Sequence, residues 1–163
     1  MTITVVSAIG WGSTTLSAFD SALKKAGVYN YNIIPLSSII PTGWQVIKRK
    51  KYPKNTKEVG YRLYMVMSEI RSNQSDKVIG AGLGWYQFPK GSGVFVEHAV
   101  EGLTEESVEK ELKIRIQLSL TDLCAFRGIK FRKRYLHMSQ AICPAMSAAH
   151  CALVAAVYKA EPW

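Results

Sequence analysis

Cysteine is scarce in this sequence of 163 residues, and the three cysteines present are not spaced for a disulfide framework. They are Cys124, Cys143 and Cys151, an odd number without a CxxC pair. This pattern disfavours a disulfide-stapled chain, so we expect a reducing compartment, the cytoplasm. We also expect no metal site, because His150 and the two cysteines nearest to it do not have ligand spacing.

Long apolar runs are absent as well, although hydrophobic residues make up 48% of the sequence. No run is long enough to span a bilayer, and we therefore expect no membrane partner. The first residues, 1–6, lack the basic flank and cleavage site of a signal peptide and are typical of a strand. A chain of 163 residues can bury a sizeable core, and we expect a single domain over 1–163.

Acidic side chains are also few, since 12 Asp and Glu stand against 21 Lys and Arg, for a formal net charge of +9. The basic residues gather in two stretches, one of Lys48, Arg49, Lys50, Lys51, Lys54 and Lys57, the other of Arg127, Lys130, Arg132, Lys133 and Arg134. We interpret them as a solvated loop and a charged edge strand, which resists aggregation. The alternative is a nucleic-acid-binding module with Tyr52, Phe131 and Tyr135 as stacking residues. No motif supports that alternative, so we do not expect nucleic acid as a partner.

Hydrophobic periodicity predicts alternating strands and helices, and we expect an α+β fold, a multi-layer αββα sandwich. Strands are expected at residues 2–9, 31–36, 59–70, 77–88 and 92–100, the last two as a hairpin. A helix is expected from about Thr15 to Lys25, with Gly27 as its stop. A longer helix is capped by Thr104 and ends at Gly128. Three segments are less determined: 41–53 is predicted as an irregular loop, 129–142 as a strand pair or one bent strand, and 145–158 as helix or strand.

Gly80, Gly82 and Gly84 form a GxGxG pattern on one face of a predicted strand. A dinucleotide-binding loop needs a different spacing and a helix directly after it, which Pro89 blocks. A face without side chains instead allows another element to approach closely. We therefore interpret the glycines as a packing surface.

The most informative motif is Leu36-Ser37-Ser38-Ile39-Ile40-Pro41, in which two adjacent hydroxyls follow an apolar strand. Alone, a serine pair usually marks a polar turn. Here it follows a helix that contains Ala18-Phe19-Asp20 and a segment that begins at Asn32, and it precedes the strand Val94-Phe95-Val96-Glu97. In this order and spacing, the motifs resemble those of the pyruvoyl-dependent arginine decarboxylases. The resemblance covers nearly the whole chain.

The resemblance implies self-cleavage between Ser37 and Ser38. The Ser38 hydroxyl would attack the Ser37 carbonyl and form an ester, and elimination would then convert Ser38 into a covalent pyruvoyl cofactor. The products would be residues 1–37 as the β chain and 38–163 as the α chain. Asn32 matches a family asparagine near the cleavage site and would polarise the Ser37 carbonyl.

The resemblance also assigns the residues that act on the substrate. Glu97 matches the family's proton donor, and strand alternation places it on the face opposite Val96. Asp20 occupies the position that pairs with a guanidinium, and Leu16, one turn earlier, would line the pocket. Two further pocket positions, Tyr29 and Tyr31, depart from the small and aliphatic residues that the family tends to carry.

The function implied by the resemblance is decarboxylation of L-arginine to agmatine and carbon dioxide by a homotrimer or a dimer of trimers. The sites would lie between subunits. An uncleaved family member that acts as a subunit or scaffold is the other alternative. Because Tyr29 and Tyr31 depart from the family pattern, the substrate could be arginine or another amino acid. Glu101 is the alternative to Glu97 as proton donor if the strand register differs.

Overall fold

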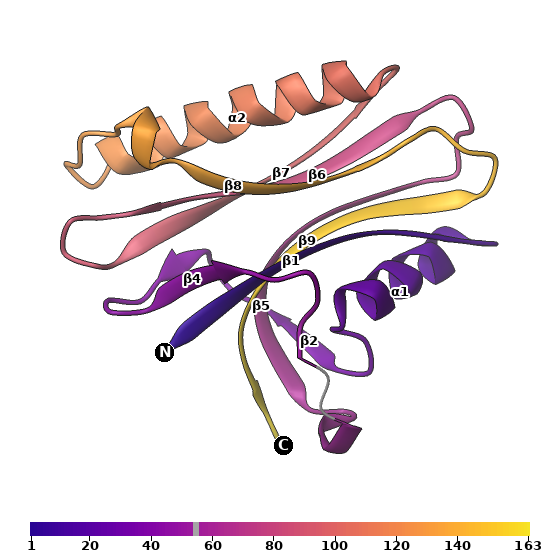
Figure 1. Ribbon diagram of the computed structural model, residues 1–163, viewed down its shortest axis with the longest axis horizontal. Helices are drawn as coiled ribbons and strands as arrows, with labels where there is room; N and C mark the ends of the chain where they lie inside the picture. Colours follow the sequence, from indigo (N-terminus) through magenta and orange to yellow (C-terminus); the bar gives the residue numbers. More distant parts are fainter. Residues whose placement is uncertain (54–55) are drawn as a thin grey trace.

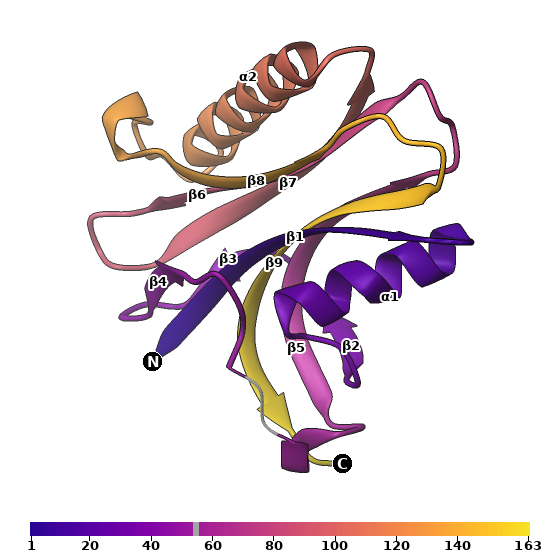
Figure 2. The ribbon, with the colours of Figure 1, turned by 45° about the vertical axis from the view of Figure 1, so that its right-hand side comes forward.

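The computed structural model describes residues 1–53 and 56–163. Over these residues the chain forms β1 (Thr2–Gly12), α1 (Thr15–Ala26), β2 (Asn32–Pro35), β3 (Ile39–Ile40), β4 (Gln45–Lys48), β5 (Arg62–Ser72), β6 (Val78–Gln87), β7 (Gly93–Gly102), α2 (Glu105–Ala125), β8 (His137–Cys143) and β9 (Ala149–Glu161), with short 3-10 helices at Thr56–Glu58 and Lys133–Tyr135. The strands make two stacked sheets, and one helix covers the outer face of each (Figure 1, Figure 2). This arrangement confirms the predicted α+β sandwich.

The five-stranded sheet has the order β2-β5-β9-β1-β4 and carries α1 on its outer face. Helix α1 begins at a capping box between Thr14 and Ser17 and ends at Gly27, whose left-handed backbone satisfies the last carbonyls. A Cβ atom at Gly10 would collide with the backbone of Ala18 and Ala22. The absence of a side chain at Gly10 therefore lets α1 lie directly on the sheet.

The four-stranded sheet has the order β3-β7-β6-β8 and carries α2 on its outer face. The three glycines of β6 lie beneath this helix, where added Cβ atoms would meet Val108, Leu112 and Ile116. The interpretation of the glycines as a packing surface is therefore confirmed. The element that approaches the glycines closely is the helix α2. As predicted, Thr104 caps its first turn, in a capping box with Ser107.

The main core lies between the two sheets. Its fully buried members come from strands of both sheets and include Ile3, Val66, Leu83, Phe95 and Val154. Because successive residues of a strand point to opposite faces, the neighbouring positions pack under the helices in separate clusters.

The structure settles the secondary structure of three segments for which the sequence pattern was not decisive. Residues 149–161 are a central strand, β9, and only one strand, β8, forms within 129–142. The predicted irregular loop at 41–53 contains β4, which pairs in parallel with β1 through Ile3 and Val46. That part of the loop prediction is wrong. Lys54, named in the first basic stretch, lies outside the described residues.

No helix in the described residues is both long enough and apolar enough to cross a membrane. The three cysteines are buried and free.

Candidate active site

The serine pair lies where the chain passes from one sheet to the other. Strand β2 belongs to the five-stranded sheet and β3 to the four-stranded sheet, so Ser37 and Ser38 form the crossover. The φ angle of Ser38 is +64°, in the left-handed region that residues with a Cβ atom avoid. Its carbonyl accepts a hydrogen bond of 2.8 Å from the Phe95 N–H. The sheets thus hold Ser38 in a conformation that it would rarely adopt alone.

A carboxylate contacts the Ser38 side chain directly. The Ser38 hydroxyl donates a hydrogen bond to Oε1 of Glu97 on β7. Glu97 lies opposite Leu83 and on the inter-sheet face, whereas Val96 packs toward α2, as strand alternation predicts. Two residues that are 59 positions apart in sequence therefore meet at the crossover.

Tyr158 on β9 is a third member of this cluster, and sequence reasoning missed it. Its hydroxyl donates to the Ile39 carbonyl over 2.8 Å. Burial, together with the nearby Glu97 carboxylate, raises the pKa of the Tyr158 hydroxyl, so it stays a donor. Its only sequence signal is a hydroxyl at the end of an apolar strand, which is too common to identify a site.

Asn32 is not close to the serine pair within one chain. It begins β2, and its side-chain amide donates to the Gly60 carbonyl over 2.7 Å. Four residue steps along an extended chain lead from Asn32 to Leu36, a span of about 13 Å before Ser37 is reached. The proposed contact between Asn32 and the Ser37 carbonyl therefore does not form within the chain.

Asp20 and Leu16 lie on α1, outside the five-stranded sheet. Both are exposed, and Leu16 is 68% exposed, which is unusual for a leucine on a helix that packs against a sheet. In the described part of the chain, no hydrogen bond or ion pair involves the Asp20 carboxylate. The two residues share a helix face but not the crossover with Ser38.

Tyr29 and Tyr31 line a small surface pocket with Glu58 and Val59. The Tyr31 hydroxyl donates to Oε2 of Glu58 over 2.6 Å. Burial and this bond raise the pKa of Tyr31. The pocket therefore has two aromatic rings and a carboxylate, groups that attract a cation.

Two other polar residues of β7, His98 and Glu101, do not contact the crossover. His98 points toward α2, where its Nε2 lies 2.8 Å from the Ser119 hydroxyl. Burial and the charge of Arg115 lower the pKa of His98. Glu101 is exposed near the end of the strand. Neither residue joins the crossover, so Glu97 is the carboxylate that the strand register places there.

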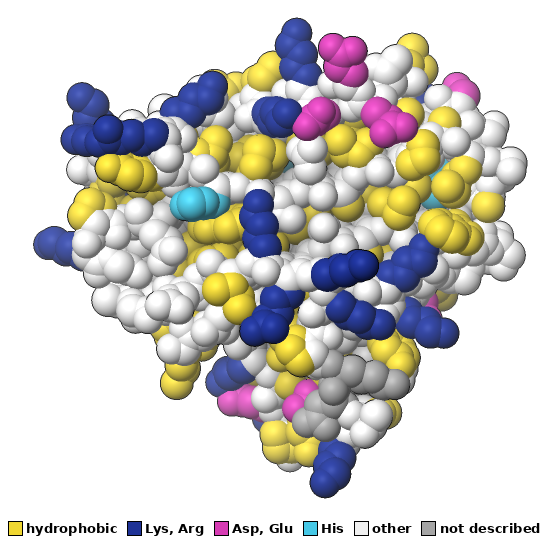
Figure 3. All heavy atoms as spheres, in the orientation of Figure 1, with side chains coloured by type: hydrophobic (Ala, Val, Ile, Leu, Met, Phe, Trp, Pro, Cys, Tyr) yellow, Lys and Arg dark blue, Asp and Glu magenta, His cyan; other side chains and the backbone are white. Residues whose placement is uncertain are grey.

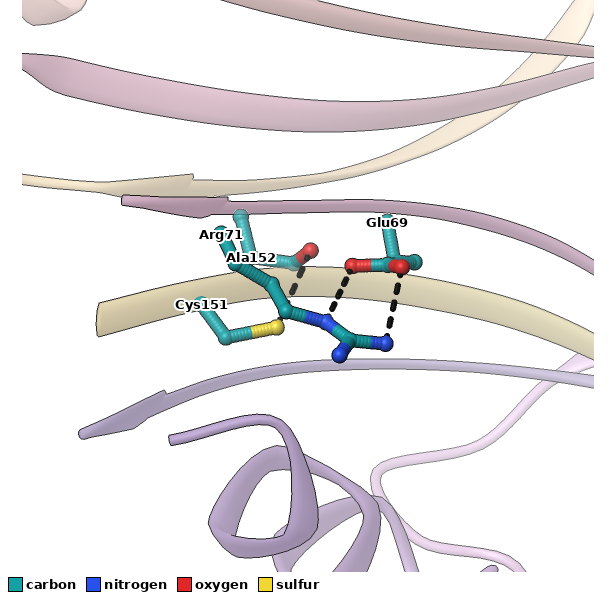
Figure 4. Close-up of polar contacts among 4 residues, drawn as sticks. All are labelled: Glu69, Arg71, Cys151 and Ala152. Carbon is teal, nitrogen blue, oxygen red and sulfur yellow. Dashed lines mark hydrogen bonds and ion pairs between the residues drawn. The ribbon is translucent and has the colours of Figure 1, made fainter. Parts of the chain in front are cut away.

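Cys143, His150 and Cys151 are accounted for by packing. His150 is fully buried, and its Nδ1 lies 3.0 Å from the Ala148 carbonyl. Cys151 lies beside the ion pair between Glu69 and Arg71, and its thiol contacts the Ala152 carbonyl at 3.6 Å (Figure 4). Burial raises the pKa of Cys151 to about 12, so its thiol is not an activated nucleophile.

The αββα sandwich thus brings a conformationally constrained serine and a carboxylate into contact at its crossover, and this is the candidate active site of an enzyme. The sequence model of the family described as pyruvoyl-dependent arginine decarboxylase matches residues 2–161. The chain belongs to this family.

Individual relatives agree with the family match. A protein of Thermococcus sibiricus named pyruvoyl-dependent arginine decarboxylase is 35% identical over 115 residues, which cover 64% of this chain and 69% of the relative. A protein of the same name from Pyrococcus horikoshii is 32% identical over 120 residues, or 68% of this chain and 73% of the relative. The one from Picrophilus torridus is 31% identical over 121 residues, or 71% and 65%.

The family implies a covalent pyruvoyl group as cofactor. The residues at the crossover fit such a group. Ser38 supplies the atoms from which it would form, its backbone is constrained, and its hydroxyl contacts a carboxylate that could take its proton.

Proposed function

We propose that this protein decarboxylates L-arginine to agmatine and carbon dioxide after cutting itself between Ser37 and Ser38. One observation carries the proposal: Ser38 has a left-handed backbone, and its hydroxyl donates to Glu97. The family match supports the reaction, since the matching relatives bear the name of arginine decarboxylases.

Self-cleavage would begin at the Ser38 hydroxyl. Glu97 takes the hydroxyl proton, and the oxygen attacks the Ser37 carbonyl carbon. The Ser37–Ser38 peptide C–N bond then breaks as its nitrogen takes up the proton held by Glu97, which leaves an ester and a free Ser38 amine. Relief of the unfavourable φ angle at Ser38 favours this acyl shift.

The ester is then eliminated. Loss of the Ser38 α-proton expels the Ser37 carboxylate and leaves dehydroalanine at position 38. Water adds to it, ammonia leaves, and the pyruvoyl group remains. Residues 1–37 and 38–163 would stay associated, because β1 pairs with β9 and β2 pairs with β5 across the cut.

Glu97 is placed to serve in the second reaction as well. The pyruvoyl group takes up the electrons released when carbon dioxide leaves the substrate. Glu97, next to this group, would return a proton to the former α-carbon of the product. Tyr158 would act as a positioning residue, because it fixes the carbonyl of Ile39, the residue after the pyruvoyl.

Substrate recognition would require a second copy of the chain. Asp20 and Leu16 are exposed on α1, on the outer side of the sheet that separates them from the crossover. We propose a homotrimer, or a dimer of trimers, in which a neighbouring copy brings these residues to Ser38. Asn32 would reach Ser37 in the same way, since it does not reach the Ser37 of its own chain.

The test is the mass of the denatured protein together with its activity on arginine. We expect two fragments that divide at Ser37/Ser38, a blocked N-terminus on the larger fragment, and agmatine as the product. The Ser38→Ala variant should stay intact and inactive. The Ser37→Ala variant keeps the attacked carbonyl and should still be cut. A single intact chain after prolonged incubation would indicate a scaffold or subunit and would contradict the proposal.

A further inference from the structure

A large pocket lies between the tip of the β6–β7 hairpin and the segment after α2. Its volume is about 920 Å³, within the roughly 300–1,000 Å³ that is usual for small-molecule sites. Glu97 and Ser38 lie on the inter-sheet side of β7, whereas Tyr86 of this pocket packs toward α2. The four-stranded sheet therefore separates the pocket from the candidate active site.

Positive charge dominates the pocket lining. Its charged residues are Lys90, Arg127, Lys130 and Arg132, and none of the described residues that line it is acidic. In the described part of the chain, none of these four side chains forms an ion pair. Lys and Arg side chains gather over the segment between α2 and β8, at the upper left of Figure 3. Four like charges around one hollow repel each other and attract a multiply charged anion.

Aromatic rings line the same pocket. Tyr86 is buried between Phe88, at a ring distance of 6.2 Å, and Phe131, at 5.3 Å. Tyr135 is 49% exposed, and the guanidinium of Arg134 lies 4.8 Å from its ring. An exposed ring beside cations is the combination that binds a planar base next to phosphate groups.

We propose that this pocket binds a nucleoside polyphosphate. The cations would contact the phosphates, and Tyr135 would contact the base. A single hollow of about 920 Å³ matches the size of a small ligand, whereas a long polynucleotide is bound along a continuous basic groove. Residues 48–51 of the first basic stretch lie at the end of β4 and directly after it, at the edge of the other sheet.

Two triple variants with the same loss of charge test the proposal. The pocket variant is Lys90→Gln/Lys130→Gln/Arg132→Gln. The control variant is Arg49→Gln/Lys50→Gln/Lys51→Gln, which also removes one arginine and two lysines from exposed positions. Arg127 is left in place because its guanidinium donates to the Leu123 carbonyl at the end of α2. Self-cleavage and circular dichroism report whether each variant folds.

Calorimetric titration with ATP, tripolyphosphate and adenosine gives the readout. We expect ATP to bind the wild type and the control variant equally, and to bind the pocket variant at least about tenfold more weakly. Tripolyphosphate alone should bind the wild type more weakly than ATP does. The Tyr135→Ala variant should lose this preference for ATP.

Several results would overturn the proposal. Equal losses in both triple variants would mean that net charge alone attracts ATP. Equal affinities for tripolyphosphate and ATP would remove the base from the interaction. Binding of a 15-nucleotide oligomer that ATP does not displace would indicate a polynucleotide surface. A smaller assembly in sedimentation of the pocket variant would instead show that a second copy of the chain fills the pocket.

Discussion

The two halves of the candidate site differ in how far one chain completes them. Ser38, Glu97 and Tyr158 come from three distant parts of the sequence, and the fold connects them at one crossover. Asp20 and Leu16 lie exposed on the opposite side of the five-stranded sheet. The half that would make the cofactor is therefore built by folding, whereas the half that would recognise the substrate is not.

This difference assigns different requirements to the two reactions. Self-cleavage would depend on the constrained backbone of Ser38 and on a carboxylate of the same chain. Substrate binding would depend on the exposed residues of α1, Asp20 and Leu16, which do not contact the crossover of their own chain. The net charge of the protein adds a further requirement for substrate binding, because a charge of +9 repels a cationic substrate at long range. Local carboxylates such as Asp20 would have to supply the attraction at the site.

The largest effect is expected from Glu97→Gln, which tests the completed half. The amide keeps the shape of the side chain but neither takes the Ser38 proton nor donates an acidic one. We expect slow self-cleavage, and in whatever enzyme is processed, a kcat about 10²–10⁴-fold lower. Fragment mass over time and agmatine release measure the two steps.

Glu101→Gln is the matched control, since Glu101 lies on the same strand but is exposed. It should leave both rates close to those of the wild type. A normal kcat in Glu97→Gln would remove Glu97 from the proton transfer. A large loss in Glu101→Gln would indicate that the strand register at the crossover is different.

The sequence predicts most of the fold because its local signals agree. Gly27 ends α1 and Thr104 begins α2, as the capping preferences of these residues predict. Strand β4 could not be predicted, because its four residues form a strand only by pairing with β1. β9 is apolar on both faces, so its periodicity did not distinguish a buried strand from a helix.

Residues of the candidate site could be predicted only where a local pattern in the sequence, such as strand alternation or the serine pair, indicated them. Alternation placed Glu97 on the correct face of β7, and the serine pair stood out between apolar runs. Tyr158 was missed because its contact with Ile39 spans 119 positions of sequence and leaves no local pattern. The separation of Asn32 from Ser37 follows from the strand predicted at 31–36, which extends the chain between them and is observed as β2.

The next largest effect is expected from Asp20→Asn, which tests the open half. Loss of a charged hydrogen bond to the guanidinium should raise KM for arginine by about tenfold to a hundredfold. Self-cleavage should be unchanged, since Asp20 does not contact the crossover of its own chain. Asp122→Asn, at an exposed aspartate of α2, is the control for charge alone.

Mixed assemblies sharpen the same comparison. Asp20→Ala and Ser38→Ala chains should each be inactive at low arginine. Co-expressed, they should regain activity in about one site in four if each site takes its two halves from neighbouring copies. No recovery in verified mixed assemblies would place Asp20 and Ser38 of one site in the same chain.

The smallest effect is expected from Tyr31→Phe, in the pocket with Tyr29. The change removes the hydroxyl that donates to Glu58 and keeps the ring. We expect a loss of about 1 kcal/mol in the free energy of unfolding, because a half-buried carboxylate loses one donor. Denaturant midpoints measure it, with Tyr135→Phe as the control at an exposed tyrosine. KM should change far less than in Asp20→Asn, since the ring and Glu58 remain. An equal rise in KM would mean that the Tyr31 hydroxyl binds the substrate itself.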